Sequence, residues 1–246
     1  MAYQQLAVIY DLLMEDTPYQ EWLAFTKKHL KPSARRVLDL GCGTGKMSVL
    51  LSKAGYQMTG VDLSEDMLVE ASQRALTEKQ SIQWIQQDMT ALEGFNNYDA
   101  VVSYLDVVNY LPDLSSVTQV FSNVYHALND SGVFLFDVHS MGHVEKMVNE
   151  IYSVVDERYS YIWFCEPGQY PGAMRHDLTF FIQDGELYQR FDEVHQQRTF
   201  TVSAYMDALR QVGFKAVHLY QDFEPNERTL ENIDNEDARF FFVAKK

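Results

Sequence analysis

Short apolar runs alternate with amphipathic segments along the first half of the chain. The runs have the length and composition of buried parallel strands, and they lie at residues 36–40, 57–61, 82–86, 100–104 and 133–138. Between them, apolar residues recur at helical spacing over residues 47–54, 65–76 and 114–128. Ser64 precedes two acids, which is typical of a helix start, and Gly55 is typical of a helix end. This alternation predicts an α/β fold built on a doubly wound, mainly parallel sheet.

The pattern changes in the second half of the chain. Residues 151–200 are rich in Tyr, Phe, Val and Thr with period-two stretches, and Asp184-Gly185 is a strong signal for a hairpin turn. This predicts an antiparallel β insertion after the fifth strand. Residues 202–212 return to helical spacing, and residues 214–220 and 239–244 predict two further strands, so that the sheet has seven strands in all. We expect the insertion to form a cap over the carboxyl edge of the sheet.

These patterns divide the chain into four parts. We predict an N-terminal helical segment at residues 1–34, a cofactor-binding core at 35–140, the antiparallel cap insertion at 141–200 and a return to the core sheet at 201–246. No repeat of fixed period interrupts this order.

Composition and charge narrow the possible partners. Hydrophobic residues make up 46% of the 246 positions, and 35 acidic against 20 basic side chains give a net charge of −15. This charge disfavours nucleic acid as a partner, because binding to a phosphate backbone depends on basic side chains. The sequence contains no long apolar run and has acids near its start, which predicts no membrane span, no signal peptide and a cytoplasmic location. Two cysteines, Cys42 and Cys165, indicate neither a disulfide scaffold nor a structural zinc site.

A glycine-rich segment, VLDLGCGTG at residues 37–45, follows the first predicted strand and opens a helix. Glycine lets the backbone turn tightly and approach a ligand, and the free N–H groups of the following helix attract a negatively charged group. A dinucleotide fingerprint needs a third glycine or an alanine at position 46, where this chain has lysine. The segment therefore predicts a cofactor-binding loop, and its spacing disfavours a nicotinamide dinucleotide.

The run Asp39-Leu40-Gly41-Cys42-Gly43-Thr44-Gly45 resembles motif I of the class I S-adenosylmethionine-dependent methyltransferases. Three further segments match that family in the same order: GVDLSEDML at 60–68, WIQQDMTAL at 84–92 and YDAVVSYLDVVNYL at 98–111. The stretches YDLLMEDTPYQEW and EVHQQRTFT are similar to a group of small bacterial members. The resemblance implies a Rossmann-like methyltransferase fold and S-adenosylmethionine as the cofactor.

The resemblance also implies which residues contact the cofactor. Asp62 ends the second strand, where an acid accepts hydrogen bonds from both ribose hydroxyls. Leu63 and Met67 would flank the adenine, and Asp88 would accept from its amino group. The full set of implied contacts is Asp39, Gly41, Cys42, Gly43, Gly45, Asp62, Leu63, Met67, Asp88, Met89 and Tyr104. Two of these acids have a purely structural alternative, since Asp39 could satisfy loop N–H groups and Asp88 could cap the turn that follows it.

The sequence does not decide which residues take part in the chemical step. Methyl transfer from a sulfonium depends mainly on orientation, and a general base is needed only if the acceptor must lose a proton. The candidates for a catalytic role are Tyr10, Tyr19, Asp106, His139 and His195. His139 and His143 have the spacing of a metal pair on a helix, but no third ligand accompanies them, so we predict no metal.

Motifs that are missing from the fourth-strand segment narrow the class of methyl acceptor. Base-amino methyltransferases of the family carry an (Asp/Asn)-Pro-Pro-aromatic motif there and cytosine-C5 enzymes a Pro-Cys pair, whereas this chain has Tyr104-Leu105-Asp106-Val107. Together with the acidity and the cap, this predicts a small molecule that accepts the methyl group on oxygen or nitrogen. A monomer and a homodimer both remain open. The alternatives are a cofactor-binding but catalytically silent interaction module and a nicotinamide-dependent oxidoreductase.

Overall fold

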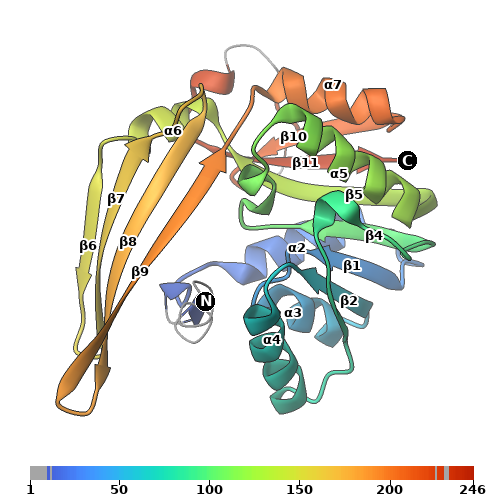
Figure 1. Ribbon diagram of the computed structural model, residues 1–246. Helices are drawn as coiled ribbons and strands as arrows, with labels where there is room; N and C mark the ends of the chain where they lie inside the picture. The colour runs from blue at the N-terminus through green and yellow to red at the C-terminus, as the bar shows by residue number, and fades with distance from the viewer. Residues whose placement is uncertain (1–9, 12, 225, 230–232) are drawn as a thin grey trace.

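A computed structural model shows two β-sheets that face each other across a central space (Figure 1). It describes residues 10–11, 13–224, 226–229 and 233–246. Part of the predicted N-terminal helical segment, positions 1–9 and 12, lies outside the described residues.

The larger sheet has seven strands in the order β10-β11-β5-β4-β1-β2-β3. Its five strands from β3 to β5 are parallel, and β11 runs antiparallel to both β5 and β10. The strands are β1 Arg36–Leu40, β2 Gln57–Asp62, β3 Gln83–Gln86, β4 Tyr98–Ser103, β5 Leu128–His139, β10 Ala216–Gln221 and β11 Arg239–Lys245. The strand order reverses between β1 and β4, which is the point where open α/β sheets bind ligands at their carboxyl edge.

Helices cover both faces of this sheet, as the alternating pattern predicts. One apolar core packs α5 and α7 against the sheet, and a second packs α2 and α3 against the opposite face. The helices are α2 Tyr19–His29, α3 Lys46–Lys53, α4 Glu65–Thr77, α5 Leu114–Ala127, α6 Met141–Met147 and α7 Val202–Val212, with short 3-10 turns η1 Met89–Ala91, η2 Val107–Tyr110 and η3 Ile233–Asn235. None of the helices among the described residues is long and apolar enough to cross a bilayer.

The smaller sheet is the cap. It is antiparallel and four-stranded, in the order β6-β7-β8-β9. Its strands are β6 Ile151–Val155, β7 Tyr159–Pro167, β8 Ala173–Asp184 and β9 Leu187–Arg198, and Gly185 in the β8–β9 turn has a φ of 63°. The predicted fold class, a seven-stranded mainly parallel sheet with an antiparallel insertion after the fifth strand, is confirmed.

Boundaries of several elements differ from the predicted ones by a few residues. The largest difference is at β5, which begins at Leu128 and not at Val133, because Leu128 pairs with Tyr98 beyond an irregularity in the β4–β5 ladder. Predicted end signals hold elsewhere: the Ser64 side chain accepts a hydrogen bond from the Met67 N–H, and Gly55, just after α3, has a left-handed backbone with a φ of 99°.

Candidate active site

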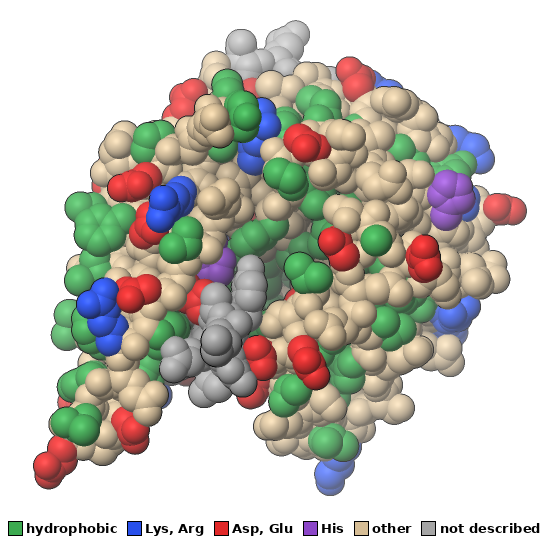
Figure 2. Space-filling view, in the orientation of Figure 1, with side chains coloured by type: hydrophobic (Ala, Val, Ile, Leu, Met, Phe, Trp, Pro, Cys, Tyr) green, Lys and Arg blue, Asp and Glu red, His purple; other side chains and the backbone are tan. Residues whose placement is uncertain are grey.

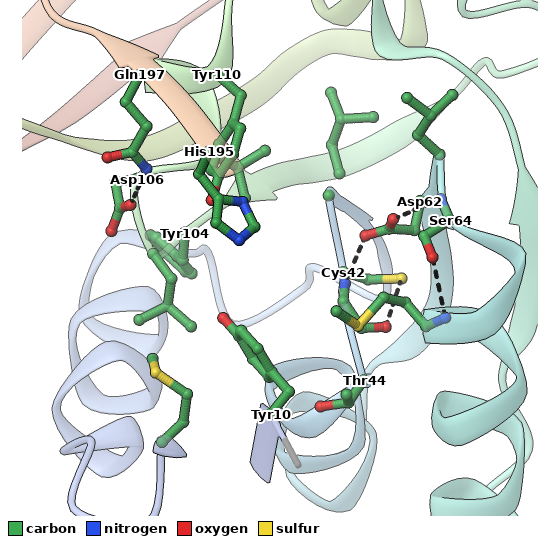
Figure 3. A pocket seen from close by; sticks show the side chains of 18 of the residues that line it. Tyr10, Cys42, Thr44, Asp62, Ser64, Tyr104, Asp106, Tyr110, His195 and Gln197 are labelled. Atoms are coloured by element: carbon green, nitrogen blue, oxygen red, sulfur yellow. Dashed lines mark hydrogen bonds between the residues drawn. The ribbon is translucent and has the colours of Figure 1, made fainter. Parts of the chain in front are cut away.

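A cavity of about 750 Å³ lies between the carboxyl edge of the large sheet and the inner face of the cap. Figure 2 shows it as a hollow lined by hydrophobic side chains. Its volume falls within the range of ligand pockets, roughly 300–1,000 Å³. Figure 3 shows Asp62, Ser64 and Cys42 on one side of this space and Asp106, Gln197 and Tyr110 on the other. The cavity therefore has two ends of different composition.

The glycine loop forms the floor of the first end. The N–H groups of Gly41 and Cys42 both donate to the carbonyl of Val61, at 2.8 and 2.9 Å, which ties the loop to the end of β2. Gly43 has a φ of 52°, and a Cβ atom added there would meet nothing within 4 Å. The space above Gly43 is thus open to a ligand, and the backbone can approach that ligand closely.

Asp62 is held beside this loop by two backbone donors. Its Oδ2 accepts from the Gly43 N–H at 2.7 Å, and its Oδ1 accepts from the Ser64 N–H at 2.9 Å. Burial raises the pKa of this carboxyl, and the backbone hydrogen bonds oppose that rise. Each carboxylate oxygen keeps a further lone pair, which is what two vicinal ribose hydroxyls require. The residues at this end therefore fit an adenosine-containing cofactor.

The predicted adenine contacts lie along the same wall. Leu63 lines the cavity and is 66% exposed, so its side chain is available as an apolar contact for a ring. Met67 and Met89 also line it. The Oδ1 atom of Asp88 accepts from the N–H and hydroxyl of Thr90 at 2.8 and 2.7 Å. Asp88 therefore does cap the following turn, and it faces the cavity as well.

Asp39 and Gly45 contribute differently from the rest of the motif. Asp39 is 2% exposed and accepts a hydrogen bond from Ser48 Oγ at 2.5 Å, and burial raises its pKa to about 7. Gly45 does not line the cavity, because a Cβ atom there would lie 2.7 Å from Trp84 and 2.8 Å from Ala71. Gly45 therefore also allows close packing of α3 against its neighbours, and its contact with the cofactor stays a prediction.

The described part of the N-terminal segment packs over the glycine loop. Asp11 accepts a hydrogen bond from Thr44 Oγ1 at 2.8 Å and pairs with Arg74. Tyr10 packs in an apolar cluster that joins Met67 of α4 to Phe180 of the cap. This segment therefore closes the cavity from the side that neither sheet covers.

Neither tyrosine candidate is suited to act as a base. Burial raises the pKa of Tyr10 well above its ordinary value and that of Tyr19 to about 12. Both phenols therefore stay protonated near neutral pH. They line the cavity as hydrogen-bond donors and aromatic walls. Tyr104 also lines it, but its hydroxyl lies 2.8 Å from Thr26 Oγ1 in the interior.

A strained turn follows β4 at the second end of the cavity. Leu105 and Asp106 both have left-handed backbones, with φ of 63° and 53°, a conformation that costs a non-glycine residue free energy. Asp137, fully buried in β5, accepts hydrogen bonds from both of their N–H groups, at 2.9 and 3.0 Å. It also accepts from Trp22 Nε1 at 3.1 Å and pairs with Arg239. Asp137 therefore holds this turn in place.

Asp106 is an anchor for neighbouring groups and is poorly suited to take a proton. Burial opposes its charge, but His139 and Arg239 outweigh that effect and hold its pKa well below the usual range. Arg239 Nη2 donates to its Oδ1 at 2.9 Å, and Gln197 Nε2 donates to its Oδ2 at 2.6 Å. Since this carboxylate is ionised and already engaged, we reject Asp106 as a general base.

Four histidines reach the same end of the cavity: His139, His143, His176 and His195. Burial lowers the pKa of His143, His176 and His195, so these three are neutral imidazoles near neutral pH. His139 points its Nε2 toward Asp106 at 3.5 Å, and its Nδ1 is buried without a hydrogen-bond partner. Because Nδ1 is out of contact with solvent, His139 supports Asp106 and is not placed to reach an acceptor.

His176 connects the cap to the strained turn. Trp163 Nε1 donates to His176 Nδ1 at 3.0 Å, so the proton of this ring is on Nε2, which lies 3.2 Å from Gln197 Oε1. Gln197 in turn donates to Asp106. The rings of His139 and His143 stack on each other at this end of the cavity, with their centroids 4.3 Å apart. Among the described residues, no three His, Cys, Asp or Glu side chains are grouped so as to hold a metal ion.

The structure thus gathers all five catalytic candidates and every predicted cofactor contact except Gly45 around one cavity. The sequence did not point to Asp11, Asp137, Gln197 or Arg239. Asp137 could have been found, because a lone acid inside the apolar run FLFDV is costly unless it is bonded. Gln197 and Arg239 carry no comparable signal, since their partners are distant in sequence.

Comparison with known proteins agrees with this fold. A methyltransferase domain family matches residues 37–132. A Geobacillus sp. (strain WCH70) protein named as a methyltransferase is 42% identical and covers 100% of both chains, and YqeM of Bacillus subtilis (strain 168), also named as one, is 40% identical over 100% of this chain and 98% of its own. The crystal structure of an S-adenosylmethionine-dependent methyltransferase from Clostridium acetobutylicum ATCC 824 superposes with a TM-score of 0.85, at 26% identity over 100% of this chain and 99% of the other.

The fold and the site define a protein that binds an adenosine-containing cofactor at the carboxyl edge of a parallel sheet. With these relatives, the chain belongs to the class I S-adenosylmethionine-dependent methyltransferase family. It is a methyltransferase and its cofactor is S-adenosylmethionine. The family membership favours this activity over the nicotinamide-dependent oxidoreductase.

Replacing Asp62 by alanine tests the ribose assignment. We expect Asp62→Ala to weaken binding of S-adenosylhomocysteine at least tenfold, about 1.4 kcal/mol, because the ribose hydroxyls lose their acceptor. Isothermal titration calorimetry measures this directly. Glu65→Ala, at the exposed start of α4, serves as the control and should bind normally. Unchanged affinity in a folded Asp62→Ala protein would remove the assignment.

Proposed function

We propose that this protein transfers the methyl group of S-adenosylmethionine to an oxygen or nitrogen nucleophile of a small molecule by in-line displacement. The observation that carries the proposal is the two-ended cavity. Its first end holds the glycine loop and Asp62, and its second end is roofed by the cap. A recessed space of this size suits a small acceptor better than a macromolecule. The net charge of −15 also disfavours nucleic acid.

The chain's own contribution is mainly orientation and exclusion of water. When bound, the cofactor supplies a methyl carbon on a sulfonium, with a neutral thioether as leaving group. The turn at Leu105 and Asp106, the cap and the Tyr10 segment enclose the space beside the glycine loop. Holding the two reacting partners in line can supply roughly 7–11 kcal/mol of the barrier.

His195 is the best-placed residue to take a proton from the acceptor. It projects from β9, and Figure 3 shows its ring pointing into the cavity above Tyr10. Burial lowers its pKa, so the ring is neutral and can accept a proton at neutral pH. Its Nδ1 lies 3.4 Å from the Tyr110 hydroxyl.

Replacing His195 by glutamine should lower kcat by about 100-fold, since general base catalysis contributes about 10²- to 10⁴-fold. Affinity for S-adenosylhomocysteine should not change, because His195 lies away from the glycine loop. The wild-type rate should fall at acid pH, where the imidazole is protonated, with a midpoint below the ordinary histidine value because its pKa is lowered. His126→Gln, on the exposed surface of α5, is the matched control. Full activity in His195→Gln would exclude this role.

The proposal as a whole is tested with methyl-labelled S-adenosylmethionine and a panel of metabolites with free hydroxyl and amino groups. We expect label in at least one small molecule and none in RNA or protein. Calorimetry with S-adenosylhomocysteine checks that the protein used is competent to bind cofactor. A protein that binds cofactor but labels none of the panel would instead favour the silent interaction module.

A further inference from the structure

The methionine part of S-adenosylmethionine carries an ammonium and a carboxylate on the same carbon atom. The contacts assigned to the ribose and the adenine compensate neither of these two charges. A charge that is taken out of water is costly unless an opposite charge or hydrogen-bond donors compensate it. The first end of the cavity must therefore provide an acceptor for the ammonium and a cation or free donors for the carboxylate.

Asp39 has the properties that an acceptor for the ammonium requires. It lies near the end of β1, lines the cavity and is 2% exposed. Burial raises its pKa to about 7, against the opposing hydrogen bond from Ser48 Oγ. An ammonium group beside this carboxylate would offset the cost of its burial. The ammonium therefore has a partner at this end of the cavity.

The backbone of the glycine loop has already used most of its donors. The N–H groups of Gly41, Cys42 and Gly43 all donate to groups at the end of β2. The N–H group of Gly45 donates within the loop, to the carbonyl of Cys42 at 2.9 Å. These four donors hold the loop in shape, so the carboxylate of the cofactor needs a positively charged side chain.

Lys46 is suited to provide that charge. Of the described residues that line the cavity, only Lys46 and Arg239 are lysine or arginine. Arg239 is bound by two carboxylates at the second end, those of Asp106 and Asp137. Lys46 is the first residue of α3, directly after the glycine loop, and no carboxylate of the described residues pairs with it. Lys46 is thus a cation at the first end whose charge is not yet matched.

The ring of Tyr19 lies next to both Lys46 and Asp39. Lys46 Nζ lies over this ring, 4.4 Å from its centroid. Burial raises the pKa of the Tyr19 phenol to about 12, and the nearby charge of Asp39 adds to that rise. Lys46 also borders a smaller outer groove, but Glu78 in that groove is already paired with Lys53 at 2.6 Å. Two opposite charges carried on one carbon need an acid and a cation placed together in this way.

We propose that Lys46 binds the carboxylate of the methionine part of S-adenosylmethionine, and that it thereby selects against forms of the cofactor that lack this group. The inference concerns the cofactor and does not depend on the identity of the methyl acceptor. The ammonium of lysine stands on a flexible four-carbon stem, so it can reach the carboxylate while Asp39 binds the neighbouring ammonium. Hydrogen bonds between two charged groups are roughly twice as strong as neutral ones, so this contact contributes measurably to affinity.

Two ligands that differ only in the carboxylate test this assignment: S-adenosylhomocysteine and decarboxylated S-adenosylhomocysteine. Isothermal titration calorimetry measures the affinity of each for wild type, Lys46→Met, Lys46→Gln and Lys53→Met. Methionine has nearly the length of lysine and lacks its charge, and glutamine gives a second uncharged variant. Lys53→Met is the matched control, because Lys53 lies on the same helix and is exposed.

We expect wild type and Lys53→Met to bind S-adenosylhomocysteine at least tenfold more tightly than its decarboxylated form. Lys46→Met and Lys46→Gln should each bind S-adenosylhomocysteine about tenfold more weakly than wild type, or about 1.4 kcal/mol. Their affinity for the decarboxylated form should not change, which also shows that both variants are folded. The inference is overturned if these two variants weaken both ligands equally, or if they weaken neither.

Discussion

Replacing Asp137 by alanine should lower the free energy of unfolding by about 3–5 kcal/mol, the cost of removing one partner from a buried ion pair. The carboxylate is fully buried and accepts from four donors: the Trp22 indole, the N–H groups of Leu105 and Asp106, and the Arg239 guanidinium. Alanine would leave the two N–H groups and the indole unpaired. It would also leave the left-handed turn without the bonds that hold it.

Equilibrium unfolding in urea, followed by circular dichroism, measures this loss. Asp130→Ala is the control, because Asp130 lies on the same strand β5 but is exposed. Surface changes of that kind usually alter stability by less than about 0.5 kcal/mol. If Asp137→Ala and Asp130→Ala unfold at the same urea concentration, Asp137 does not support the turn in the way described.

Replacing Gly43 by valine should weaken binding of S-adenosylhomocysteine by about 1,000-fold, or about 4 kcal/mol. The missing Cβ of Gly43 opens directly onto cavity space, with no atom within 4 Å. Its φ of 52° also costs an L-residue about 1–2 kcal/mol of folding stability. A branched side chain there would occupy the volume that the cofactor needs.

Gly94→Val separates these two effects. Gly94 also has a positive φ, 85°, and no atom within 4 Å of an added Cβ, but it does not line the cavity. Both variants should therefore lose similar stability in thermal unfolding, while only Gly43→Val loses affinity in calorimetry. If Gly43→Val binds S-adenosylhomocysteine as tightly as Gly94→Val, the space above Gly43 is not where the cofactor binds.

The architecture could be predicted from the sequence because its signals are local. Buried strands such as Arg36–Leu40 are continuous apolar runs, helix ends carry Ser64 and Gly213, and the hairpin turn at Asp184-Gly185 has its own signature. Each of these depends on residues that are adjacent or one turn apart. The cofactor loop is equally local, which is why Gly43 and Asp62 were found together with the strand ends that carry them.

The arrangement of residues at the second end of the cavity could not be predicted in the same way. Gln197 contacts Asp106 across 91 positions, and Arg239 contacts it across 133, so only the folded chain brings these side chains together. The choice among catalytic candidates also depended on surroundings. In the sequence, Asp106 and His139 are as suitable as His195, and only the low pKa of Asp106 and the burial of His139 Nδ1 separate them.

The hydrogen-bonded series from Trp163 through His176 and Gln197 to Asp106 has a practical consequence for altering this enzyme. Because it joins the cap to the left-handed turn that follows β4, a change at any of these positions made to admit a new compound would also disturb that turn. Met147 and Met174 also line the cavity, but they take no part in this series of hydrogen bonds. Enlarging the space at these two thioether side chains is therefore the route by which selectivity and turnover can be adjusted separately.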